Sequence, residues 1–75
     1  MPRTKANPKH VADNLHAQAI PDVESALDSL DRILESELSA GVVRNVVAAQ
    51  KELVKGLGSL KAALAVALVE AEEQS

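Results

Sequence analysis

An apolar stripe between residues 42 and 73 constrains the fold more than any other feature of this sequence. Apolar residues recur at two heptad positions along the whole span, and Gln50 is the one polar interruption. A helix of this span would be about 48 Å long at about 1.5 Å per residue, too long and too apolar to stand alone in a chain of 75 residues. The stripe comprises Val43, Val46, Gln50, Leu53, Leu57, Leu60, Leu64, Ala67 and Ala71.

The positions beside the stripe widen its apolar face. Ala49, Gly56 and Ala63 flank it on one side, where a two-stranded coiled coil usually carries charge. Residues 62–69 are apolar around the whole helix, so this segment needs burial on all sides. The pattern favours a helical bundle with several neighbours over an isolated coiled coil.

Composition indicates one small domain with an aliphatic core. The chain has no Phe, Tyr or Trp, no cysteine, and a hydrophobic fraction of 47%, and strand patterns are missing. A domain of this size without a disulfide often gains buried area from a partner. We therefore expect a single all-α domain over residues 1–75, a helical hairpin or small bundle that oligomerisation completes.

Helix signals divide the chain into four segments. Residues 1–7 read as a basic arm, and Asn7 followed by Pro8 begins a short helix over residues 8–19. Pro21 should break that helix and open an acidic amphipathic helix over residues 21–39. The long apolar helix then occupies residues 42–73.

Glycines leave two alternatives open. Gly41 predicts a turn between antiparallel helices, which we favour over one helix that tolerates this glycine at about 1 kcal/mol. Gly56 and Gly58 could separate a last helix, but the stripe keeps its phase through them, which favours one continuous helix.

Charge is segregated along the chain. Residues 21–40 hold six acids and one Arg, a net charge of −5, whereas Arg44, Lys51, Lys55 and Lys61 lie in the first two thirds of the last segment. In a hairpin these cations could lie near the acidic helix, where exposed pairs contribute about 0–1 kcal/mol each.

The sequence contains little that predicts chemistry. His10, Asp13 and His16 are three residues apart on a helix and do not converge as the histidines of a zinc helix do. The Gly56–Gly58 stretch follows no strand and lacks phosphate-loop spacing. We expect no enzyme, no catalytic residues, no metal and no cofactor. Gln50 either pairs with its counterpart to set the register or the oligomeric state, or lies exposed at the end of the core.

Protein is the partner that these patterns predict, through self-association or through a larger assembly. The alternative is a nucleic-acid-associated regulator that uses Arg3, Lys5 and Lys9, although a pI near 5.2 disfavours nucleic acid. A secretion signal and a membrane span are both missing, so a soluble cytoplasmic protein is expected. The predicted interface comprises Leu53, Leu57, Leu60, Leu64, Val66, Leu68 and Val69.

Overall fold

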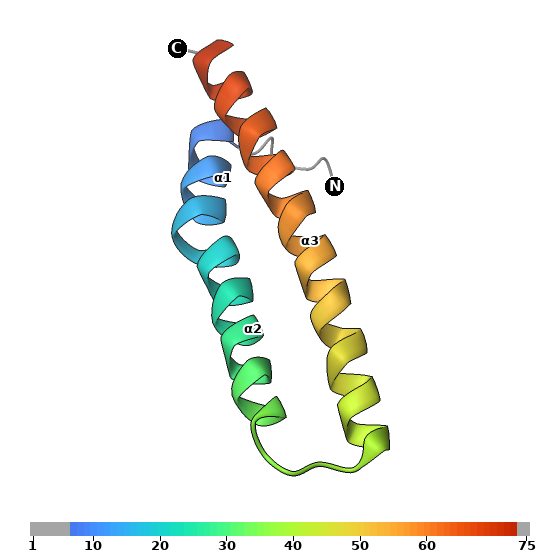
Figure 1. The fold of residues 1–75 in the computed structure, drawn as a ribbon. Coiled ribbons are helices and arrows are strands. Elements are labelled where there is room, and N and C mark those ends of the chain that lie inside the picture. Colours follow the sequence, from blue (N-terminus) through green and yellow to red (C-terminus); the bar gives the residue numbers. More distant parts are fainter. Residues whose placement is uncertain (1–6, 74–75) are drawn as a thin grey trace, which may run out of the picture.

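Two antiparallel helical arms form a hairpin in the computed structural model, which describes residues 7–73 (Figure 1). The first arm runs through α1 (Pro8–Asn14), a π-helical turn η1 (Leu15–Ala19) and α2 (Ile20–Leu34). The second arm is the single helix α3 (Ala40–Glu73), and the described part of the chain contains no strand. The predicted all-α class, with one long C-terminal helix, is confirmed.

The predicted start of the first helix is also confirmed. The Asn7 side chain accepts a hydrogen bond of 3.0 Å from the backbone N–H of Lys9, and Pro8 occupies the first helical turn. Proline is well suited to that position, because its missing N–H would have no partner inside the helix.

The predicted break at Pro21 is wrong, because the first arm continues through it as helix. Ala19 and Ile20 both keep right-handed helical φ and ψ. The turn that precedes the proline widens instead, and the Ile20 N–H donates to the Leu15 carbonyl five residues back. A π turn of this kind relieves the proline, which lacks an N–H and whose ring would crowd the carbonyl four residues earlier.

The π turn also changes which residues face the second arm. Before it, the less exposed positions are Pro8, Ala12, Leu15 and Ala19; after it they are Ile20, Val23, Leu27, Leu30 and Leu34. The two sets are out of phase by one residue on a regular helix. One extra residue in the π turn restores the alignment, so α1 and α2 present one continuous face to α3.

The hairpin is confirmed, but its turn precedes the predicted position at Gly41. The acidic helix ends at Leu34, and α3 begins at Ala40. The Val42 backbone N–H donates to Ser39 Oγ at 3.3 Å, so Ser39 caps α3. Gly41 therefore lies inside the first turn of α3, and no described glycine has a positive φ. The serine cap thus determines where the helix starts, in place of a glycine terminator.

Helix α3 runs without interruption through Gly56 and Gly58, as predicted. Its less exposed residues include every member of the heptad stripe except Val43. The molecule measures 53 × 26 × 15 Å, so it is two helices wide and one helix thick. Within residues 7–73 no helix combines the length and apolar character needed to cross a bilayer.

Candidate interaction surface

The contact between the two arms shields its apolar side chains only in part. Among the described residues the buried hydrophobic ones are Ala12, Ile20 and Ala67, and no large side chain is fully enclosed. The leucines of α2 and α3 that face each other remain partly accessible to solvent. The two arms form a single layer, so no second layer within residues 7–73 covers the side chains between them. Stable domains usually pack two layers.

The residues of the predicted interface fall into two groups. Leu53, Leu57, Leu60 and Leu64 lie partly covered along the seam with the first arm. Val66, Leu68 and Val69 remain 52–59% exposed. The first group contributes to the hairpin itself, so the second group is the part that is open to a partner.

The exposed group lies near the C-terminal end of α3, in a turn that packs against α1 on one side only. Figure 1 shows α3 running past the start of α1, so its last turns have no neighbouring helix. Ala67 faces α1 and is only 5% exposed. Leu68, on a neighbouring side, lines a shallow cleft with Ala12 and His16. Val66 and Val69 lie on the surface beyond, which the first arm does not reach.

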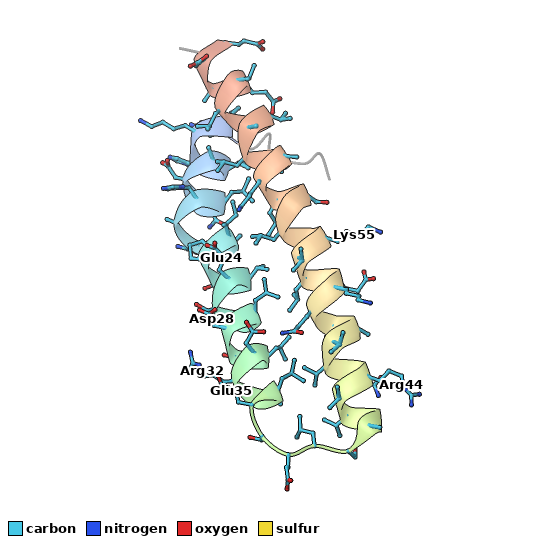
Figure 2. All side chains as sticks on the ribbon, viewed as in Figure 1. Glu24, Asp28, Arg32, Glu35, Arg44 and Lys55 are labelled. Atoms are coloured by element: carbon cyan, nitrogen blue, oxygen red, sulfur yellow. The ribbon has the colours of Figure 1, made fainter. Side chains whose placement is uncertain are left out.

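The basic and acidic side chains that we expected near one another point apart. Figure 2 shows Glu24, Asp28 and Glu35 directed outward from α2, on the side away from α3. Arg44 and Lys55 are directed outward from α3, on the opposite edge of the hairpin. The hairpin therefore carries one acidic edge and one basic edge, and these labelled side chains do not pair between its arms.

A side-chain hydrogen bond joins the two arms near the middle of the hairpin. Gln50 Nε2 donates to Asp31 Oδ1 at 2.6 Å, from the middle of α3 to α2. Gln50 is therefore not exposed at the end of the core, because it pairs within its own chain and is partly covered. Pairing with its counterpart in another copy stays a prediction.

Within the described part of the chain, the histidines form no metal site, and Lys9 alone represents the predicted nucleic-acid contact. His10, Asp13 and His16 are all exposed, and no group of three metal-ligating side chains converges anywhere in residues 7–73. Lys9 is exposed in the first turn of α1. Arg3 and Lys5 lie outside the described residues, so the nucleic-acid alternative stays a prediction, which salt-dependent mobility on a DNA gel would test.

An open groove near the turn was not predicted. Leu30 forms its wall on α2, and Val42, Val46 and Ala49 line it on α3, together with Gly41 and Asn45. The spacing of Val42, Ala49, Gly56 and Ala63, every seventh residue, is the sequence signal that could have indicated it, because these residues share one flank of the stripe.

Comparison with known proteins adds no family: no family model matches this chain, and no curated protein or solved structure matches it significantly. The function must therefore be inferred from the surface itself.

Proposed function

We propose that this chain is a non-enzymatic helical module for protein–protein interaction, which self-associates or forms a small structural subunit of a larger assembly. One observation carries the proposal: the described residues enclose no large side chain fully, while eight large hydrophobic residues are 38–59% exposed. Contiguous exposed apolar surface on a small protein is typical of a contact site. In this proposal, oligomerisation completes the bundle, and the cytoplasm stays the predicted location.

The segment around Val66, Leu68 and Val69 is the proposed centre of contact. These side chains are within one turn of α3 and remain 52–59% exposed. Burying one such side chain from full exposure contributes about 1.5–3 kcal/mol, so covering the exposed part of all three favours a contact here.

Sedimentation of the unmodified protein and of a Leu68→Glu variant tests this proposal. The glutamate places a charge in the proposed contact, so the variant should become monomeric or leave its assembly while keeping its helical circular dichroism. Ser25→Glu is the matched control, because it adds the same charge at an exposed position of α2. A monomer at high micromolar concentration would exclude self-association. If Leu68→Glu also retains every partner, this segment is not the interface.

A further inference from the structure

The two broad faces of the hairpin differ in character. On α2, Ala26, Leu30 and Ile33 follow one another at helical spacing, so they form one strip, and Leu30 lines the open groove. Asp31 lies across the seam from that strip, where it contacts Gln50. We call the groove side the small-residue face; it comprises Ala26, Leu30, Ile33, Val42, Ala49, Gly56 and Ala63.

The small-residue face is mostly apolar and open, and the polar Asn45 also lines its groove. Ile33 is 44% exposed and Val42 is 45% exposed. A methyl group added at Gly56 would meet no atom within 4 Å, so nothing in this chain fills the space above that glycine. A helix-interior glycine costs about 1 kcal/mol relative to alanine, and no contact within the chain requires it here.

We infer that a second copy of this chain covers the small-residue face, with Ile33 of each copy seated in the groove of the other. The inference rests on the self-association in the proposed function and gives the dimer a contact on this face, which does not include Val66, Leu68 or Val69; in this arrangement those three residues contact the larger assembly. A second layer turns a hairpin one helix thick into a four-helix bundle, in which the partly covered leucines of both copies become interior.

Charge selects how the two layers are stacked. Residues 21–40 carry a net charge of −5, whereas residues 41–61 hold four Lys or Arg and one Glu, a net charge of +3. A two-fold axis parallel to the helices places α2 of one copy over α3 of the other, so opposite charges come together. The other two-fold arrangement would stack acidic α2 on acidic α2.

The residue levels agree with this stacking. The hydrogen bond between Asp31 and Gln50 places residues 31 and 50 at the same height along the hairpin. Because the arms are antiparallel, the numbers of an α2 residue and of the α3 residue level with it add up to about 81. Ile33 then lies near position 48, beside Ala49, and Ala26 lies near position 55, beside Gly56. A two-fold axis parallel to the helices does not change the height of a residue along the hairpin. Residues of one copy therefore face residues of the other copy at the same height. The large Ile33 thus meets the groove, and the small Ala26 meets a glycine.

The available area is sufficient for a stable dimer. The small-residue face extends about 32 Å along α3, from residue 42 to residue 63 at about 1.5 Å per residue. Across a hairpin 26 Å wide this gives an outline of roughly 800 Å², which matches the ~800 Å² that a standard interface takes from each partner. The contact also brings no acid directly opposite another: Asp22 would lie level with Ser59, and Ser29 with Glu52, by the same relation of levels.

Cysteine cross-linking tests the geometry, because the chain has no cysteine of its own. Ile33→Cys and Ala49→Cys proteins are mixed and mildly oxidised, and the covalent dimer is quantified on a non-reducing gel. We expect several-fold more dimer from this mixture than from either variant alone, since a disulfide needs Cα atoms about 4–7 Å apart. The matched control mixes Arg32→Cys with Ala49→Cys, because Arg32 points outward from α2 (Figure 2).

Each result has a defined meaning once circular dichroism shows that the variants are helical. Equal yields from the two mixtures, in a protein that sediments as a dimer, would overturn this face and leave the proposed function standing. Preferential cross-linking of Ile33→Cys to itself would indicate the acidic-on-acidic stacking and would also overturn the inference. A monomer at high micromolar concentration would remove self-association altogether. An Ile33→Glu variant should sediment as a monomer, and a dimer of that variant would contradict the proposal independently.

Discussion

Gln50 and Asp31 are joined by a hydrogen bond of 2.6 Å that links the middle of α3 to α2. The less exposed residues of the two arms are otherwise mainly apolar within the described part of the chain, and apolar side chains alone allow one helix to slide past another by a turn. A polar residue in an apolar seam commonly determines register, because only one alignment gives it a partner. The bond therefore fixes which residues of the two arms lie opposite one another.

A double-mutant cycle should detect this bond. Gln50→Ala and Asp31→Ala are each expected to destabilise the protein, and the coupling energy between them should be about 0.5–1 kcal/mol, since Asp31 is exposed and Gln50 only partly covered. Chemical denaturation of the two single variants and the double variant gives this energy. Strict additivity would mean that the two side chains do not interact in solution.

Leucine truncations along the seam should cost less than in a closed core. Leu57→Ala and Leu60→Ala each remove groups that are only partly covered, so about 1–2 kcal/mol is expected in the monomer, below the ~2–5 kcal/mol of full burial. Urea denaturation at low protein concentration measures this loss. Lys55→Ala and Glu52→Ala, both exposed, should stay within about 0.5 kcal/mol. Equal losses in the two groups would mean that the packed face of α3 is assigned wrongly.

The long-range pattern of α3 was predictable from the sequence. The heptad period identified the side of the helix that packs, because a fixed period of apolar residues can be buried only along one line. It also indicated correctly that Gly56 and Gly58 do not interrupt the helix. The all-round apolar character of residues 62–69 indicated that one neighbouring helix would leave part of this segment exposed, and Val66, Leu68 and Val69 are the large residues that remain so.

The helix boundaries were less predictable from the sequence, because neighbouring residues favour different end points. Ser39 and Gly41 offer rival boundaries two residues apart, and only the hydrogen bond from the Val42 N–H to Ser39 Oγ shows that the serine prevails. Pro21 was assumed to end a helix, whereas the arm stays helical through a π turn in which the Ile20 N–H donates to the Leu15 carbonyl. The groove was missed because it depends on how α2 and α3 sit relative to each other.

The π turn is expected to act as a one-residue insertion that can be removed. Deleting Ala17 together with Pro21→Ala should convert η1 into a regular turn and keep α1 aligned with α3, because the deletion and the loss of the π turn cancel. Helical circular dichroism should be retained, and thermal unfolding should stay close to that of the parent protein.

A deletion elsewhere in the first arm provides the contrast. Removing Ser25 from α2 rotates everything before it by about 100°, since a helix has about 3.6 residues per turn. Pro8 and Ala12, now buried, would turn toward solvent, and the melting temperature should fall. If both deletions lowered stability alike, the π turn would not be the element that aligns the arm.

Alanine substitutions at Gly56 and Gly58 separate effects on the single hairpin from effects on the proposed dimer. In the hairpin, a methyl group at either position meets nothing within 4 Å, so Gly56→Ala and Gly58→Ala should each stabilise the monomer by about 0.5–1 kcal/mol through helix propensity. Only Gly56 lies on the small-residue face, where the second copy would approach closely. Sedimentation equilibrium should therefore show weaker association for Gly56→Ala, while Gly58→Ala associates as the parent protein does. Equal association of the two variants, with both monomers stabilised, would place the contact on another face.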